Sequence, residues 1–260
     1  MENKEAVAKD SAIERMMRAT SAFIRKLDAV PGWRDARVAN LVVAMDLDDM
    51  LPERCDRTGP IVLPIDIDRE HAVVTRYLEL CDLVLSVKTC EYYFRRYPFN
   101  GLPVSRHEHL SNACELYFSR VYQFKERLKH LVDAVDALVP QHGLQFGPFI
   151  KQFAKEFDSE IRERNQIHHF ERFMDLDIER IFLTGLHDLV RPNGGWRDEQ
   201  RAYYRKVAKE WVQRVRIRGA RLDAFLEAVA EALLQGCPFL TNTSAPRVAD
   251  GEAKLGSAKT

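Results

Sequence analysis

Apolar residues recur every three or four positions over most of the chain, which is the spacing of one face of an α-helix. The clearest case is segment 106–138, where this spacing holds throughout: Leu110, Cys114, Tyr117, Val121, Phe124, Leu128, Leu131, Val135 and Leu138. The same pattern predicts helices over 11–28, 34–50, 68–97, 175–190, 198–217 and 220–234, and from Pro148 into the stretch at 162–169. Since no strand-rich region interrupts these segments, the sequence predicts an all-α fold.

Proline, glycine and capping residues mark the expected helix ends. Pro31 and Gly32 follow the first helix, and Pro98 follows the third. Asp68 is the expected N-cap of that third helix, because its side chain can accept from a free backbone N–H. Pro148 suits the first turn of the next helix, where a missing N–H is tolerated.

These elements divide the chain into three parts. We expect a helical appendage over residues 1–60, a helical bundle over 61–240 and a disordered tail over 241–260, which is small and polar. Apolar residues nearly encircle the 68–97 helix, so a central and largely buried position is expected for it.

Composition indicates a soluble protein with a substantial core. The chain has 260 residues, of which 46% are hydrophobic and 30% charged, and its formal net charge is zero. The five cysteines are scattered and form no CxxC pair, so buried thiols in a reducing compartment are favoured over disulfides or zinc. A charged N-terminus and short apolar runs indicate neither a secretory signal nor a membrane span. A cytoplasmic protein without a membrane contact is therefore expected.

Candidate chemistry gathers in the stretch RERNQIHHFERF, residues 162–173. On a continuous helix, Glu160, Arg164 and His168 lie at positions i, i+4 and i+8. They then share the side that carries Phe153 and Phe157 toward the core. A carboxylate, a guanidinium and an imidazole therefore point toward a place where apolar side chains are expected.

Two interpretations of this triplet remain open. In the structural one, Glu160 pairs with Arg164 and His168 bonds a backbone group, because a buried charge must be paired. In the functional one, the planar guanidinium of Arg164 grips phosphate oxygens and histidine transfers protons near neutral pH. Arginine and histidine without clustered carboxylates suit attack on phosphate without a metal ion.

The sequence Arg164-Asn165-Gln166-Ile167-His168-His169 resembles the R-N-x-x-x-H signature of HEPN domains, which are all-α bundles. The resemblance covers residues 70–190 as architecture and six residues as motif. It implies a HEPN-like helical bundle and, by analogy with many members, an endoribonuclease that needs no metal or other cofactor. The RNA 2′-hydroxyl would attack its own phosphate and leave a cyclic phosphate end.

The same resemblance implies roles for individual residues and partners. Arg164 would hold the scissile phosphate, His169 would act as general acid and base, and Asn165 would help to position the site. From helix spacing rather than from the resemblance, Arg162 lies seven residues before His169 and would share its face, so it is expected as a substrate contact, and Glu160 is expected as another. RNA, a second copy in a homodimer, and an antitoxin or defence-system protein are the implied partners. The alternative is a catalytically inactive HEPN-like module for interaction or nucleotide binding.

Helix geometry and the family motif point to different histidines. On an unbroken helix, His169 lies about 140° around the axis from Arg164, whereas His168 lies one turn beyond it. Either the helix breaks within the motif, or a dimer brings the groups together, or His168 takes part. We therefore keep His168 as a catalytic candidate beside His169.

Other segments provide weaker signals. His107 and His109 do not share a helix face, so we expect no metal site there and a surface position at a helix start. Segment 191–221 has ten Arg or Lys residues against three acids, interleaved with Tyr203, Tyr204 and Trp211. This mixture suits a single-stranded nucleic-acid groove, or a solvated helix face whose aromatic rings enter the core. The motifs of P-loop ATPases, HExxH zinc hydrolases and GxSxG hydrolases are absent from the sequence.

Overall fold

The all-α prediction is confirmed by the computed structural model, which describes residues 10–44, 63–169, 173–191 and 194–241. Within these ranges the chain forms α-helices and one short 3-10 helix, without a strand. The elements are α1 Ala12–Leu27, α2 Trp33–Ala44, α3 Ile65–Arg95, α4 Arg106–Leu138, α5 Phe146–Glu156, α6 Asp158–His169, α7 Leu176–Val190, α8 Trp196–Gly236 and η2 Pro238–Leu240.

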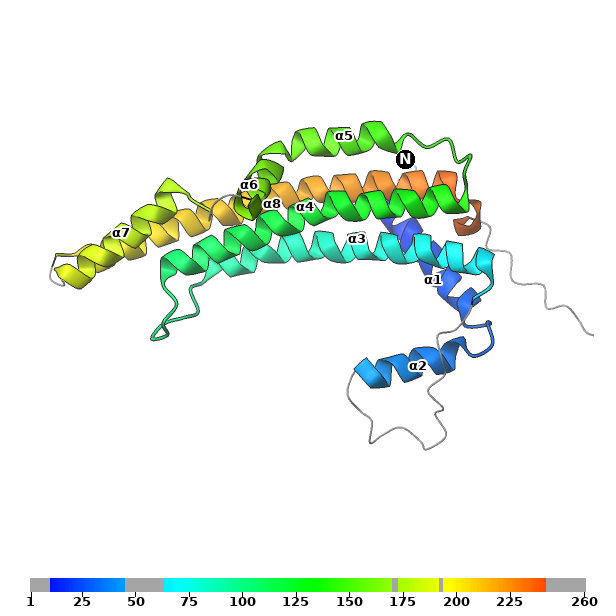
Figure 1. Ribbon diagram of the computed structural model, residues 1–260, viewed down its shortest axis with the longest axis horizontal. Coiled ribbons are helices and arrows are strands. Elements are labelled where there is room, and N and C mark those ends of the chain that lie inside the picture. Colours follow the sequence, from blue (N-terminus) through cyan, green and yellow to red (C-terminus); the bar gives the residue numbers. More distant parts are fainter. Residues whose placement is uncertain (1–9, 45–62, 170–172, 192–193, 242–260) are drawn as a thin grey trace, which may run out of the picture.

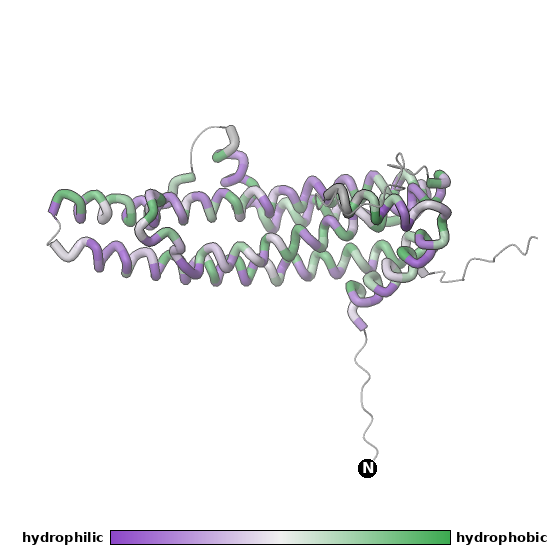
Figure 2. Tube along the Cα trace, turned by 90° about the horizontal axis from the view of Figure 1, so that it is seen from below, coloured by the Kyte–Doolittle hydropathy of each residue, from purple (hydrophilic) through white to green (hydrophobic). Residues whose placement is uncertain are grey.

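The three longest helices, α3, α4 and α8, lie side by side and form the body of the molecule (Figure 1). α3 packs against both α4 and α8, as a central position requires. Leu85 and Tyr92, however, are 61% and 63% exposed, so the prediction that this helix is largely buried is wrong. Hydrophobic and hydrophilic residues alternate along the helices (Figure 2), as expected for helices with one face in the core. α7 folds back along the first part of α8 and extends this end of the bundle.

Capping explains several helix ends, including one that we predicted wrongly. Ser105 caps α4 through a reciprocal capping box with Glu108, and Asp175 accepts from two backbone N–H groups at the start of α7. α3, however, begins at Ile65 after Pro64, so Asp68 is not its N-cap. Asp68 lies in the first turn instead, where a carboxylate is favoured by the helix dipole.

The helix predicted from Pro148 into the motif is two helices in the structure. α5 already starts at Phe146, and it ends at Glu156. Phe157 leaves the helical conformation, with φ −104° and ψ 24°, and α6 starts at Asp158 in a new direction (Figure 1). The buried ring of Phe157 stacks on Phe153 at a centroid distance of 4.7 Å, so the aromatic spacing survives the break.

The separate helices predicted over 198–217 and 220–234 form one helix of 41 residues, α8. Gly219 lies inside it and is buried. An ideal Cβ at this position would lie 2.8 Å from Cγ of Lys88 on α3. Gly219 is therefore a point of close approach between α8 and α3, and it does not end the helix.

The segment expected as an N-terminal appendage contributes α1 to the bundle. Met16, Phe23 and Leu27 of α1 belong to the hydrophobic core. The carboxylate of Glu227 on α8 accepts from the free backbone N–H of Ile13 at 3.1 Å and from that of Ala12. Most of the remaining segment before residue 61, and the expected tail from 242 on, lie outside the described residues.

The cysteines within the described part carry free thiols. Cys90, Cys114 and Cys237 are buried, and burial raises the pKa of the Cys114 thiol well above its ordinary value and that of Cys237 to about 11. Such thiols are packing residues rather than nucleophiles. None of the helices in the described ranges combines the length and apolar character needed to cross a membrane.

Candidate functional site

Glu160 is the buried anchor of α6. Its exposed fraction is 0%, and its carboxylate contacts two guanidinium groups of α8, those of Arg214 at 3.2 Å and Arg218 at 3.0 Å. It also accepts from the hydroxyls of Tyr117 at 3.3 Å and Ser159 at 2.8 Å. The carboxylate is therefore satisfied on several sides, and it joins α6 to α4 and α8.

The protonation state of Glu160 follows from these contacts. Burial by itself would raise its pKa, but the Ser159 hydroxyl and the two guanidinium groups outweigh this effect and hold the pKa below its ordinary value. Burial raises the pKa of Tyr117, so its hydroxyl keeps the proton that it donates. We expected Glu160 to contact a substrate, and this prediction is wrong because its carboxylate is fully buried. The carboxylate instead holds α6 to α4 and α8.

Arg164 lies one turn after Glu160 and has different surroundings. Its guanidinium stacks on the ring of Tyr122 on α4, 4.0 Å from the centroid, and its Nη1 donates to Oδ1 of Asn165 at 3.2 Å. Arg164 and Tyr122 are half-buried and Asn165 is exposed. Glu160 pairs with Arg214 and Arg218, and not with Arg164 as the structural interpretation had expected. Arg164 forms no ion pair within the described residues.

The remaining motif residues lie on the outer part of α6. Arg162 is exposed and pairs with Asp158 at the start of the helix. The helical backbone continues through His169, so a break within the motif is excluded. His168 therefore lies one helical turn after Arg164, and His169 lies five residues after Arg164. The side chains of both histidines lie outside the described part of the structure.

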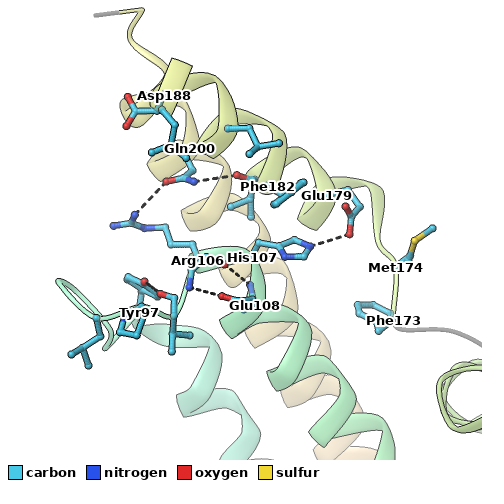
Figure 3. Close-up of a pocket in the computed structure, with 18 residues that line it drawn as sticks. Tyr97, Arg106, His107, Glu108, Phe173, Met174, Glu179, Phe182, Asp188 and Gln200 are labelled. Atoms are coloured by element: carbon cyan, nitrogen blue, oxygen red, sulfur yellow. Dashed lines mark hydrogen bonds and ion pairs between the residues drawn. The ribbon is translucent and has the colours of Figure 1, made fainter. Parts of the chain in front are cut away.

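A second candidate site is a cleft of about 970 Å³ between α7, the start of α4 and the start of α8 (Figure 3). Its apolar wall includes Phe182 and Leu186 of α7. Its polar side chains include Arg106 and His107 of α4 and Gln200 of α8. The sequence did not single out this cleft, because its walls come from segments far apart in the chain.

His107 and His109 are buried, contrary to the surface position that we expected for them. Nε2 of His107 lies 3.0 Å from the carboxylate of Glu179 on α7, and Nε2 of His109 lies 2.8 Å from the backbone oxygen of Tyr93. The two rings thus have separate partners on different elements, in agreement with the prediction that they do not share a face. No cluster of three or more His, Cys, Asp or Glu side chains able to hold a metal ion occurs among the described residues.

Most of the positive charge in segment 191–221 is paired with carboxylates. The pairs are Arg197–Asp188, Arg201–Asp198, Lys206–Asp177, Arg214–Glu160, Arg216–Glu91, Arg218–Glu160 and Arg221–Glu156. Tyr204 and Trp211 are buried in the core, and Tyr203 lies under the guanidinium of Arg180 at 4.1 Å. This arrangement favours the helix face with core aromatics over a nucleic-acid groove.

Comparison with known proteins gives no match to this chain: no family model, no curated protein and no solved structure matches it.

Proposed function

We propose that the chain is an endoribonuclease similar to catalytic HEPN domains, with its site on α6 around Arg164. The observation that carries this proposal is the state of the Arg164 guanidinium. It is held in place by Tyr122 and Asn165, is half-buried, and has no carboxylate partner among the described residues. A positioned arginine without a counter-charge suits a phosphate group of a substrate.

The stacking of Arg164 on Tyr122 supports this use of the side chain. A guanidinium that rests on an aromatic ring by its flat face keeps the N–H groups along its edge free. Among the described residues, the one hydrogen bond of the Arg164 guanidinium runs from Nη1 to Oδ1 of Asn165. The remaining donors suit two oxygens of one phosphate group, which is the bidentate contact that arginine favours.

The ion pairs of the buried Glu160 carboxylate fix the position of the helix that carries this site. They hold α6 against α8 at one end, while Tyr122 of α4 lies under Arg164 one turn later. An electrostatic site works best when its charges are already positioned before the reaction. Glu160 is thus a structural support for the site, and Arg162 remains a candidate phosphate contact on the exposed side of α6.

The proposed reaction needs a phosphate ligand and a proton carrier. Arg164 stabilises the negative charge that grows on the non-bridging phosphate oxygens. A histidine takes the proton from the 2′-hydroxyl as its oxygen bonds to phosphorus. The bond from phosphorus to the 5′-oxygen breaks, and the protonated histidine returns its proton to that oxygen, which restores the neutral imidazole. The products are a 2′,3′-cyclic phosphate and a 5′-hydroxyl.

Two arrangements can supply the histidine. His168 follows Arg164 by one turn of α6 and would act within the same chain. His169, which the HEPN motif names, lies about 140° around the helix axis from Arg164 and would act on a phosphate held by a second copy. A homodimer therefore belongs to the proposal if His169 is the catalytic residue.

The test is cleavage of end-labelled single-stranded RNA by the full chain in the presence of EDTA. We expect wild type to cut, and Arg164→Ala to lose at least about 100-fold in rate, because one positioned donor in such sites contributes that much. Arg180→Ala is the matched control. Arg180 also stacks on a tyrosine, at 4.1 Å, but lies on α7.

The histidine variants complete this experiment. Loss of cleavage in His168→Ala alone favours a site within one chain, and loss in His169→Ala alone favours a shared site. For a shared site, mixing inactive Arg164→Ala with inactive His169→Ala should restore part of the activity. Equal cleavage by wild type and Arg164→Ala would overturn the proposal, and an inert wild type would favour the helical binding module.

A further inference from the structure

The cleft between α7 and the start of α4 has the size and the lining of a small-molecule site. Its volume of about 970 Å³ lies at the upper end of the range that small ligands occupy, roughly 300–1,000 Å³. Such sites combine an apolar wall with a few fixed polar groups. Both features occur here, on helices that also pack into the bundle core.

Several large apolar side chains of the cleft wall are exposed to solvent. Leu189 of α7 has an exposed fraction of 79%, and Leu102, in the segment before α4, has 60%. Both line the cleft, as does Phe182, whose ring lies beside His107 with their centroids 5.3 Å apart. Exposed apolar side chains that line one cleft are typical of a ligand-binding groove.

All but one of the charged side chains that are described in the cleft lining have an ion pair or a capping bond. Glu179 pairs with His107 at 3.0 Å, and Asp188 pairs with Arg197 at 3.3 Å. The Glu108 carboxylate bonds the backbone N–H of Ser105 in the capping box. Among the charged side chains that line the cleft, within the described residues, Arg106 alone has no ion pair of its own or capping bond.

Arg106 is nevertheless held in a defined position. Its guanidinium lies over the ring of Tyr97, 4.7 Å from the centroid, and Nη1 donates to Oε1 of Gln200 at 3.3 Å. Nε2 of Gln200 in turn donates to the backbone oxygen of Ile181 at 3.1 Å, so the amide is fixed from both ends. Gly185 makes room for it, because a Cβ there would lie 2.5 Å from Nε2 of Gln200.

We propose that this cleft binds a small amphipathic anion, with its carboxylate or phosphate on Arg106 and its apolar body along α7. Figure 3 shows Arg106 and Gln200 on one side of the cleft and Glu179, Phe173 and Met174 on the other. The anionic end of the ligand would therefore lie on the side of the cleft away from the Glu179 carboxylate. This site is separate from the α6 site and does not rest on the proposed nuclease activity.

Isothermal titration calorimetry of the full chain tests this proposal. The probes are decanoate and decyl phosphate, which share an apolar body and differ in the anionic group. 1-Decanol supplies the same body without charge, and inorganic phosphate supplies the charge without the body. We expect at least one of the two amphipathic anions to bind with one site per chain, and both controls to bind at least tenfold more weakly.

Variants assign the binding to the cleft. Arg106→Gln should weaken anion binding on the order of tenfold or more, since it removes a charge-assisted contact. Arg205→Gln is the matched control, because Arg205 is an exposed arginine of α8 that does not line the cleft. Arg106→Lys keeps the charge but loses the planar fork, and we expect an intermediate affinity. It replaces Arg106→Gln if that variant fails to fold by circular dichroism.

Three results would overturn the proposal. They are no binding of either amphipathic anion by wild type, equal binding of 1-decanol, and equal affinity of the Arg106 and Arg205 variants. Preference for decanoate or for decyl phosphate identifies the anionic group. RNA cleavage by the same Arg106 variants should be unchanged, so failure here is distinguishable from failure of the nuclease proposal.

Discussion

Glu160 is the most constrained polar side chain of α6, and its substitution should cost stability. In Glu160→Gln the guanidinium groups of Arg214 and Arg218 lose their shared counter-charge. Both arginines are partly exposed, so water offsets some of the loss. We expect the free energy of unfolding, measured in urea at pH 7, to fall by about 1–3 kcal/mol. Glu163→Gln, three residues later on α6, should change it by less than about 0.5 kcal/mol.

The same residue predicts a dependence of stability on pH. The folded-state pKa of Glu160 lies below the ordinary value of 4.5, so the unfolded chain binds a proton more readily in acid. The stability that the carboxylate contributes is therefore present above pH 4.5 and is lost as the pH falls through the folded-state pKa. Wild type should lose stability more steeply than Glu160→Gln below this pH. Parallel curves would contradict the pairing.

Tyr122 should affect catalysis through the position of Arg164. Tyr122→Leu keeps an apolar side chain but removes the ring face, and we expect RNA cleavage to fall about fivefold, as an exposed cation–π contact contributes about 1 kcal/mol. Tyr122→Phe keeps the ring and should cleave at nearly the wild-type rate. If both variants cleave alike, the ring does not position the guanidinium.

At the residue scale, the sequence could predict which side of the helix carries Glu160 and Arg164, but not their partners. Periodicity places both on the face toward the bundle, and in the structure Glu160 is buried and Arg164 lies over Tyr122 of α4. Their contacts come from α4 and α8, and Arg214 lies 54 positions after Glu160 in the sequence. A spacing rule within one helix favours the nearest charge, which is why Arg164 was the expected partner.

Among the elements, α8 shows how a glycine inside a helix can be misinterpreted. Gly219 lies in the gap between the two helices that were predicted, over 198–217 and 220–234, and glycine lowers helix propensity. Instead, the missing side chain accommodates Lys88 of α3. Local propensity could not reveal this, because the reason for the glycine lies on another helix.

The packing of Gly219 against Lys88 predicts a coupled pair of substitutions. In a Lys88→Ala background, Gly219→Ala should stabilise the chain by up to about 1 kcal/mol, because alanine favours helix and the contact at 2.8 Å is removed. In wild type the gain should be smaller or reversed, since Lys88 must move and its 2.8 Å pair with Asp223 is disturbed. Thermal and urea unfolding of the four proteins measures this coupling. Equal effects in both backgrounds would contradict the close approach.

The break at Phe157 was missed for a related reason. The aromatic spacing of Phe153 and Phe157 continues through the break, because both rings still pack into the same core. A pattern of apolar positions records which side chains are buried, and it does not record a change in helix direction between two of them. The starts of α4 and α7 agree with the apolar pattern, and there Ser105 and Asp175 cap the first turn in the structure.

For the whole molecule, α1 is part of the core, and neighbouring methionines provide a test. Met16 has an exposed fraction of 0% and Met17 of 43%. Met16→Ala should reduce the free energy of unfolding by about 2–5 kcal/mol, because it leaves a cavity. Met17→Ala should stay within about 0.5 kcal/mol of wild type. A small change in the free energy of unfolding in both variants would contradict this and indicate that α1 is an appendage outside the core.

The helical class of the whole molecule was predictable, whereas its clefts were not. Long runs at helical spacing, with few glycines and prolines between them, leave little alternative to a bundle. The cleft beside α7 depends on Arg106, Glu179 and Gln200, which come together only when three helices meet. The burial of His107 has the same origin, as its carboxylate partner lies 72 positions away.

The measurement that tests the central claim most directly is the chemistry of the RNA ends that the chain produces. Wild type and Arg164→Ala would be incubated with one end-labelled RNA in EDTA, and the product ends identified by mass spectrometry. We predict 2′,3′-cyclic phosphate and 5′-hydroxyl ends from wild type, and a loss of these products of at least about 100-fold in Arg164→Ala. Intact RNA with wild type, or the same products in the same yield from both proteins, would contradict a nuclease site at Arg164.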